Sequence, residues 1–157
     1  MNAKLIYREG TKATKFEESS FGTLTARILA AAFEVHTVLG PGLLEAAYGR
    51  AMACELALRG IGFASQVVVP IRYKGRALDT PLRLDLIVGG EVIVEIKAVS
   101  KLDEVHRAQL LTYLRMADLR TGLLINFHVE SLRHGIRRVF NSHETSFPSL
   151  TPFTPGK

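Results

Sequence analysis

Two apolar segments that follow each other in this chain are both interrupted by acidic residues, and this feature restricts the fold most strongly. Side chains alternate between the two faces of a strand, so residues 91–98 have one fully apolar face, while Glu95 and Lys97 project from the other. Asp85 interrupts the preceding apolar segment, residues 82–88. Burying a carboxylate without a partner costs several kcal/mol. The sequence therefore predicts two strands whose charges need an ion pair or a bound cation.

These charges have two interpretations. One is an ion pair between Glu95 and Lys97 on a solvated face, with Asp85 at a strand end. The other is a magnesium site, since Mg²⁺ prefers oxygen ligands and commonly uses one or two carboxylates with water and substrate phosphate. Lys97 could then orient or activate the attacking water and counter the charge that develops on the phosphate. The residues alone leave both interpretations open.

The periodicity along the rest of the chain is that of an α/β domain. Thr23 or Thr25 would cap the first helix, and Gly40-Pro41-Gly42 would end it. Pro70 suggests an edge position or a bulge in the first strand. The predicted order is helix 23–39, helix 43–59, strand 67–73, strand 82–88, strand 91–99, helix 103–119, strand 122–127 and strand 135–140.

The length of 157 residues is enough for one compact domain. We expect an N-terminal tail or arm over residues 1–20, the domain over residues 21–140, and a disordered Ser-, Thr- and Pro-rich tail over residues 141–157. No apolar run reaches the roughly 18 residues of a membrane-spanning helix. The N-terminal segment lacks the pattern of a secretory signal. These observations favour a cytoplasmic protein without membrane contact.

Cys54 is the only cysteine of the chain. A single cysteine excludes an intrachain disulfide and a cysteine-based zinc site. Its apolar neighbours in residues 51–58 predict a small core residue.

The charge balance is positive, with 20 Lys+Arg against 15 Asp+Glu and a net charge of +5, which is compatible with nucleic acid without requiring it. Arg133, Arg137 and Arg138 lie in residues 131–140, which contain no acid. This stretch is either a solvated edge or a surface that holds a nucleic-acid backbone. In the second case, neutralising the arginines would weaken binding regardless of sequence and flatten its salt dependence.

Several short motifs, in their order along the chain, resemble those of the PD-(D/E)XK nuclease superfamily. Asp85, nine intervening residues and then Glu95-Ile96-Lys97 resemble its D…ExK signature, with Leu84 in place of the proline. Residues 109–113 resemble the QxxxY motif of its exonuclease branch. Residues 42–48 spell GxxExxY, and with the stretches 34–36, 39–42 and 123–127 they resemble the small bacterial GxxExxY protein family.

The resemblance implies a restriction-endonuclease-like α/β fold, with a mixed β-sheet flanked by helices. It also implies hydrolysis of nucleic-acid phosphodiester bonds with Mg²⁺ or Mn²⁺, with DNA as the favoured substrate and exonucleolytic cleavage as one form. The metal ligands would be Asp85, Glu95 and the carbonyl of Ile96, with Glu45 as an outer or second ligand. Lys97 would position the attacking water.

The same resemblance assigns Gln109 and Tyr113, which share one helix face, to supporting the site and contacting nucleic acid. The alternatives are a core aromatic with its hydroxyl at the rim for Tyr113 and a surface helix position for Glu45. Tyr48 is expected to pack and to orient Glu45. His36 is more often structural than catalytic at such a position. His106 and Arg107 would meet either phosphate or solvent.

Three classes of function remain open at this point. Besides a nuclease, the chain could be a nucleic-acid-binding or accessory module that keeps the nuclease fold with little or no catalysis. This reading is favoured by the small domain, which has no separate DNA-reading module. An Mg²⁺ site for a non-nucleic phosphate finds no support from a phosphate-binding glycine motif. The choice between DNA and RNA also stays open, as do the formation of a homodimer and the binding of a protein partner.

Strand parity adds a geometric condition. Asp85 and Glu95 can share a metal only if they project from the same face of the hairpin between them. A regular two-residue turn at Gly89-Gly90 would put them on opposite faces, since directly opposed residues share a face and faces alternate. We therefore predict a loop of odd length, residues 88–90, with Gly90 in the left-handed conformation. Glu95 would then be the diagonal neighbour of Asp85, roughly 7–8 Å away.

Overall fold

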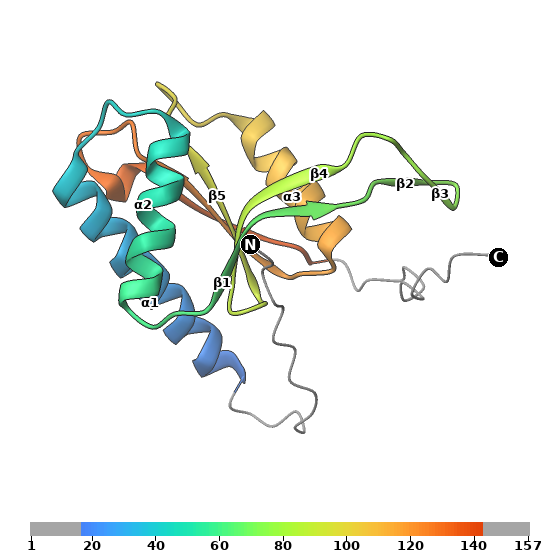
Figure 1. The fold of residues 1–157 in the computed structure, drawn as a ribbon, viewed down its shortest axis with the longest axis horizontal. Helices are drawn as coiled ribbons and strands as arrows, with labels where there is room; N and C mark the ends of the chain where they lie inside the picture. The colour runs from blue at the N-terminus through green and yellow to red at the C-terminus, as the bar shows by residue number, and fades with distance from the viewer. Residues whose placement is uncertain (1–16, 143–157) are drawn as a thin grey trace.

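A computed structural model of the chain describes residues 17–142, with side chains from residue 23 onward. The predicted tails therefore lie mostly outside the described residues. The elements are α1 (Glu17–Leu39), α2 (Glu45–Leu58), β1 (Phe63–Val69), β2 (Arg72–Tyr73), β3 (Arg76–Ala77), β4 (Leu82–Val88), β5 (Val92–Lys97), α3 (Glu104–Ala117), β6 (Thr121–Asn126), the 3₁₀ turn η1 (Leu132–Gly135) and β7 (Ile136–Phe140) (Figure 1).

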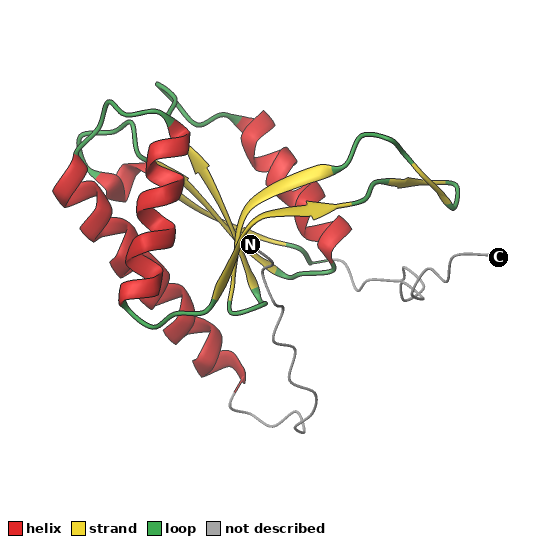
Figure 2. Cartoon of the chain, in the orientation of Figure 1, coloured by secondary structure: helices red, strands yellow, loops and turns green. Residues whose placement is uncertain are grey.

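The centre of the fold is a mixed five-stranded sheet in the order β1-β4-β5-β6-β7. β5 and β6 are parallel, joined through α3, and every other neighbouring pair is antiparallel. α1 and α2 cover one face of the sheet and α3 covers the other (Figure 2). This arrangement confirms the predicted α/β class, with a mixed sheet flanked by helices.

The alternation of β5 divides the core into two clusters. Val92, Val94 and Ile96 belong to the cluster under α1 and α2, whereas Ile93 belongs to the cluster under α3. Both clusters are sealed from water, which is the main favourable contribution to folding. Glu95 and Lys97 therefore project toward the α3 side, as the alternation predicts.

The hairpin between β4 and β5 has the odd length that the shared site requires. Val88 pairs with Val92, so the loop consists of Gly89, Gly90 and Glu91 rather than the predicted residues 88–90. Both glycines have positive φ, +62° and +73°, which costs a residue without a Cβ little. Ile93 therefore pairs with Ile87 and not with Asp85 as predicted, and the ladder ends at Leu86↔Val94, one residue before Asp85.

α1 begins at Glu17, ahead of the expected start at Thr23, so neither Thr23 nor Thr25 caps it. Thr25 is buried inside the helix instead. The predicted end is confirmed: Gly40 adopts a φ of +66° and its amide donates to the carbonyl of His36. Within the described residues, no helix is both long and apolar enough to cross a bilayer.

The segment predicted as one strand over residues 67–73 is divided at Pro70. β1 lies at an edge of the sheet, as Pro70 suggested, because proline cannot donate to a ladder. Beyond it, β2 and β3 form a separate two-stranded hairpin that the sequence pattern did not indicate. Two residues are too short for a period to be recognised.

The expectation for Cys54 is wrong, because its side chain is exposed. The buried residues of α2 are Tyr48, Met52 and Leu56, which recur every four positions along one face. Cys54 lies two residues from Met52 and Leu56, on the other side of the helix.

The end of β6 is packed against Gly135, which generates a test of the fold. A Cβ added at Gly135 would collide with the carbonyl oxygen of Asn126 and crowd Val129. We expect Gly135→Ala to lower the free energy of unfolding by about 1–3 kcal/mol, as overpacking does. Gly62→Ala is the matched control, since a Cβ there meets nothing within 4 Å. Equal losses in urea denaturation for both variants would contradict this packing.

Candidate active site

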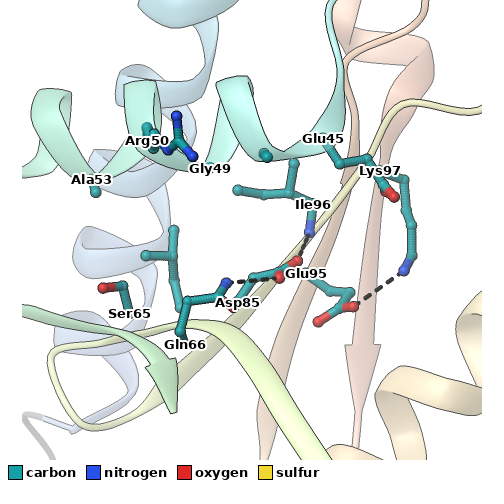
Figure 3. A pocket seen from close by; sticks show the side chains of 12 residues that line it. Glu45, Gly49, Arg50, Ala53, Ser65, Gln66, Asp85, Glu95, Ile96 and Lys97 are labelled. Carbon is teal, nitrogen blue, oxygen red and sulfur yellow. Dashed lines mark hydrogen bonds and ion pairs between the residues drawn. The ribbon is translucent and has the colours of Figure 1, made fainter.

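A pocket of about 400 Å³ opens between α2 and the strands β1, β4 and β5 (Figure 3). It brings together four of the predicted site side chains, Glu45, Asp85, Glu95 and Lys97, and also Ile96, whose carbonyl was predicted as a ligand. The remaining lining residues are Ala46, Gly49, Arg50, Ala53, Ser65, Gln66 and Leu86.

Asp85 lies where the ladder between β4 and β5 ends. The last main-chain pair is Leu86↔Val94, and beyond it the Asp85 carboxylate accepts a hydrogen bond from the Ile96 amide, Oδ2 to N 2.9 Å. Leu84 belongs to the cluster under α3 and Leu86 to the cluster under α1 and α2, so the strand changes face at this residue. Asp85 is therefore the point at which β4 turns from one layer of the core to the other.

On the neighbouring strand β1, Gln66 lies at the level where β4 changes face. It stands between the pairs Ser65↔Leu86 and Val67↔Leu84, and its φ of +52° is left-handed, which is uncommon for any residue except glycine. Its side-chain amide donates to Asp85 Oδ1 at 3.4 Å. No sequence pattern indicates this role of Gln66, because a single polar position in a strand carries no signal of a left-handed backbone.

Glu95 is a buried carboxylate with only one of its oxygens satisfied. Its side chain is 6% exposed, Lys97 donates to Oε1 at 3.1 Å, and Oε2 has no hydrogen-bond partner. Burial raises the pKa of Glu95 to about 7, the nearby Asp85 and Glu45 carboxylates add to this, and Lys97 opposes it. Glu95 is therefore poised to bind either a proton or a cation near neutral pH.

Lys97 stays protonated at neutral pH. Burial alone would lower the pKa of its ammonium, but the Glu95 carboxylate, helped by Glu45 and Asp85, outweighs this and raises the pKa above its ordinary value. A protonated lysine donates hydrogen bonds and cannot accept a proton. Its chemistry in this state is to orient a water or to counter negative charge.

Glu45 is the first residue of α2, and Figure 3 shows it on the Lys97 side of the pocket. Tyr48 holds the start of this helix: its hydroxyl donates to the carbonyl of Gly40 at 2.6 Å and accepts from the amide of Leu43 at 3.1 Å. Its ring stacks on Phe127 at 4.6 Å. These contacts are those of the packing residue that was expected.

Arg50 is a second cation of the pocket, and the sequence analysis missed it. Ala46, Gly49 and Ala53 are small residues of the same helix that also line the pocket, and their pattern does not single out Arg50. The pocket thus holds three carboxylates, Glu45, Asp85 and Glu95, against the two cations Arg50 and Lys97. This excess of negative charge suits a cation.

Gln109 and Tyr113 lie on α3 and are not among the pocket-lining residues. The Gln109 amide donates to the Tyr113 hydroxyl at 2.7 Å, so the two share a face as predicted. The Tyr113 side chain is buried, and burial followed by the negative charge of Glu95 raises its pKa. Tyr113 therefore approaches Glu95 from the α3 side, with its hydroxyl in a polar contact.

Arg133, Arg137 and Arg138 are exposed and lie away from the pocket, on η1 and the edge strand β7. Arg137 pairs with Leu124 of the α3-side cluster, and Arg138 pairs with Leu123 of the opposite cluster. The two neighbouring arginines therefore belong to opposite faces of the sheet, and they do not form a single patch.

Two histidines that were considered make local contacts. His36 Nε2 lies 2.8 Å from the carbonyl oxygen of Val129, which fits the structural alternative. His106 Nδ1 accepts a hydrogen bond from the Asp103 amide at the start of α3. Arg107 is exposed.

The donor chemistry of the pocket fits a hard divalent cation, because Asp85 and Glu95 are oxygen ligands and Glu95 Oε2 is buried without a partner. In the described part of the chain, no group of three or more His, Cys, Asp and Glu side chains is arranged to hold a metal ion. The candidate set is therefore the Asp85 and Glu95 pair with the Ile96 carbonyl, and Glu45 stands farther out.

The raised pKa of Glu95 predicts a pH-dependent cost to stability. The folded chain holds this proton up to about pH 7 and an unfolded chain only to about 4.5, so stability is lost as the pH rises through this window. In metal-free buffer, Glu95→Gln should raise the free energy of unfolding at about pH 8 by on the order of 3 kcal/mol and flatten its decline. Glu91→Gln, at an exposed position, is the control. Parallel curves for wild type and Glu95→Gln would refute the assignment.

Comparison with known proteins gives one match. The profile of the PD-(D/E)XK nuclease superfamily matches residues 22–139. No curated protein matches the chain, and no solved structure does. The match spans the three strands that line the pocket, the helix α2 and the parallel crossover through α3. Membership implies metal-dependent hydrolysis of phosphodiester bonds, with divalent metals such as Mg²⁺ typical of the family. The chain belongs to the PD-(D/E)XK nuclease superfamily.

Proposed function

We propose that this protein hydrolyses phosphodiester bonds of nucleic acid, with DNA as the favoured substrate and Mg²⁺ or Mn²⁺ as the metal. The observation that carries the proposal is the Glu95 carboxylate, which is buried with one unpartnered oxygen beside Asp85 and Lys97 in an open pocket. A carboxylate in this position destabilises the fold when ionised, so a ligand that binds it offsets a cost.

In this proposal Asp85, Glu95 and the carbonyl of Ile96 hold the metal, and Glu45 acts as an outer ligand. The metal would supply Lewis-acid polarisation of the phosphoryl group. The bond from the Ile96 amide keeps the Asp85 carboxylate beside β5, so the two acids are preorganised without the metal. Two carboxylates with a carbonyl and waters form a usual ligand set for Mg²⁺.

Lys97 would position the attacking water and donate to a phosphoryl oxygen, since its ammonium stays charged beside Glu95. Arg50 supplies a second cation to the pocket and would neutralise a substrate phosphate. Gln109 and Tyr113 would support Glu95 from α3 and contact nucleic acid, consistent with the QxxxY motif. Exonucleolytic cleavage and membership of the GxxExxY family belong to the same proposal.

Several further expectations from the sequence remain predictions. They are the domain boundaries at residues 21 and 140, the disordered tail, the cytoplasmic location, and a homodimer or protein partner. The proposed backbone contacts of Arg133, Arg137 and Arg138 also remain a prediction, now divided between two faces of the sheet.

The second candidate is a nucleic-acid-binding or accessory module that keeps the fold with little or no catalysis. It is favoured by one observation, that no cluster of three or more ligating side chains is assembled among the described residues. Asp85 and Lys97 are also engaged in internal hydrogen bonds. A purified protein that binds nucleic acid but not metal would support this alternative.

Cleavage assays with single- and double-stranded DNA and RNA test the proposed reaction. We expect Mg²⁺- or Mn²⁺-dependent cleavage by the wild type and a loss on the order of 100-fold or more in Lys97→Ala, as for removal of a donor to a developing charge. Lys101→Ala, at an exposed position beyond β5, should cleave like the wild type. A Lys97→Ala variant as active as the wild type would sink the proposal.

Metal binding has a separate readout in thermal unfolding. We expect Mg²⁺ to raise the Tm of the wild type more at about pH 8 than at about pH 6, because Glu95 must release its proton to bind the ion. The increase should vanish in Glu95→Gln and in Asp85→Asn, which keep the shape of the side chains. An Mg²⁺ response that is unchanged in both variants would place the metal elsewhere.

A further inference from the structure

A basic hairpin projects from the body of the protein between β1 and β4, two strands that line the pocket. We call residues 71–81, which contain β2 and β3, the β2–β3 arm. It forms its own two-stranded sheet and extends away from the five-stranded sheet (Figure 1). Every residue from 72 to 81 is exposed. Nothing in the core accounts for the residue types at these positions.

The arm nevertheless has a defined conformation. Lys74 and Gly75 form its tip with φ of +49° and +80°, the left-handed pair that a tight two-residue hairpin turn requires. Arg72 pairs with Ala77 and Tyr73 pairs with Arg76. The Leu78 amide donates to the carbonyl of Ile71 at 2.8 Å and closes the base. The arm thus presents its side chains in fixed positions.

The charge of the arm is strongly positive. It carries Arg72, Lys74 and Arg76 against a single acid, Asp79. Among the described residues, none of these three cations takes part in an ion pair. Three neighbouring exposed cations repel one another unless an anionic partner binds them. The charge pattern therefore points to a polyanion.

An aromatic ring stands among these cations. Directly opposed residues of an antiparallel pair share a face, so Tyr73 and Arg76 lie on the same face of the arm. The Lys74 ammonium lies 5.5 Å from the centre of the Tyr73 ring. Tyr73 is 61% exposed. An exposed ring flanked by two cations is the arrangement on which single-stranded nucleic acid binds, with a base on the ring and phosphates on the cations.

The arm is also placed to deliver a strand to the pocket. It connects β1 to β4, the strands that carry Gln66 and Asp85. The last pair of the five-stranded sheet before the arm is Val69↔Leu82, and Leu82 is separated from Asp85 by about 10 Å along β4, at roughly 3.3 Å per residue. Arg76 precedes Leu82 by six residues, which adds up to about 20 Å at the same rise. A polynucleotide bound at Tyr73 and Arg76 would have to run up to about 30 Å along β4 to reach the active site.

We propose that the β2–β3 arm binds an unpaired segment of the nucleic-acid substrate, with Tyr73 stacking on a base and Lys74 and Arg76 binding its phosphates. The inference rests on the proposed function. A duplex is the weaker fit, because its bases are stacked on one another and offer no free face to Tyr73. Arg72 lies on the other face of the arm and adds to the general positive field.

Binding measured by fluorescence anisotropy in EDTA, where no cleavage occurs, tests the arm separately from catalysis. The probes are labelled single-stranded DNA, single-stranded RNA of the same sequence, and the DNA duplex. The variants are Tyr73→Leu, which removes the ring, Tyr73→Phe, which keeps it, and the double variant Lys74→Gln/Arg76→Gln. Arg27→Gln/Arg120→Gln removes the same charge at two exposed positions outside the arm and the pocket.

We expect Tyr73→Leu to weaken the binding of single strands about tenfold, a loss within the range measured for stacking on aromatic residues. Tyr73→Phe keeps the ring and should bind like the wild type. The slope of log K against log salt is negative, and the Lys74→Gln/Arg76→Gln variant should reduce its magnitude by about 1.4, at about 0.7 per phosphate contact. The Arg27→Gln/Arg120→Gln control should bind like the wild type on all three probes, after correction for the change in net charge that both doubles share. If the arm variants bind single-stranded DNA more weakly than the wild type, or both DNA and RNA, the inference is supported. The comparison also tells which polynucleotide the arm binds.

Two outcomes would overturn the inference while leaving the proposed hydrolysis to its own cleavage assay. One is wild-type affinity in both Tyr73→Leu and the arm double variant. The other is a wild type that binds the duplex and ignores both single strands. Conversely, an arm that binds as expected in a protein that cleaves nothing would keep the inference and overturn the hydrolysis.

Discussion

The hydrogen bond from the Ile96 amide to the Asp85 carboxylate is the contact on which the candidate site depends. It lies one residue beyond the last main-chain pair of β4 and β5, where β4 changes from one layer of the core to the other. A side chain there continues the ladder when the main chain no longer can. The same bond fixes an acid beside Glu95, so a structural requirement of the sheet and a chemical requirement of the pocket are met by one group. The left-handed backbone of Gln66 on β1 allows this change of face without an inserted residue.

At Glu95 the structural requirement and the chemical requirement conflict. The sheet gains nothing from a buried carboxylate, and burial near Asp85 and Glu45 raises the pKa of Glu95 to about 7. A single bond to Lys97 offsets only part of the cost, because Oε2 remains without a partner. An apolar residue at this position would pack better on the α3 side of the sheet, where Ile93 belongs to the core. A metal bound at Oε2, as proposed above, would offset this cost, and the loss of stability in the free protein would then be a consequence of function. The Glu95 carboxylate also raises the pKa of Lys97, so the lysine stays charged beside the acid with which it would act.

Much of this could be predicted from the sequence, because alternation and parity are strict rules. The shared face of Glu95 and Lys97 and the odd length of the hairpin loop follow from a period of two. The exact loop residues did not, since the triplets 88–90 and 89–91 both satisfy parity and both contain the two glycines. Only packing selects between them, because Val88 is buried in the core and stays paired with Val92. Gln66 and Arg50 were missed because each depends on tertiary contacts, a left-handed backbone in one case and the approach of α2 to the sheet in the other. The exposed Cys54 shows the reverse error, in which apolar neighbours in sequence were mistaken for neighbours in space.

The sheet also explains why two basic segments of similar composition are not equivalent. β7 is an edge strand, and its successive arginines Arg137 and Arg138 point to opposite faces, so their charges are divided. A tight hairpin gathers charge instead, because opposed residues share a face and the turn adds its own side chains. Tyr73, Lys74 and Arg76 are therefore concentrated at one place, on a connection between the strands of Gln66 and Asp85. The acidic pocket would by itself repel a polyanion. The positive charge of the arm, on the connection between two strands of the pocket, would attract a nucleic-acid strand to the molecule despite the negative charge of the pocket.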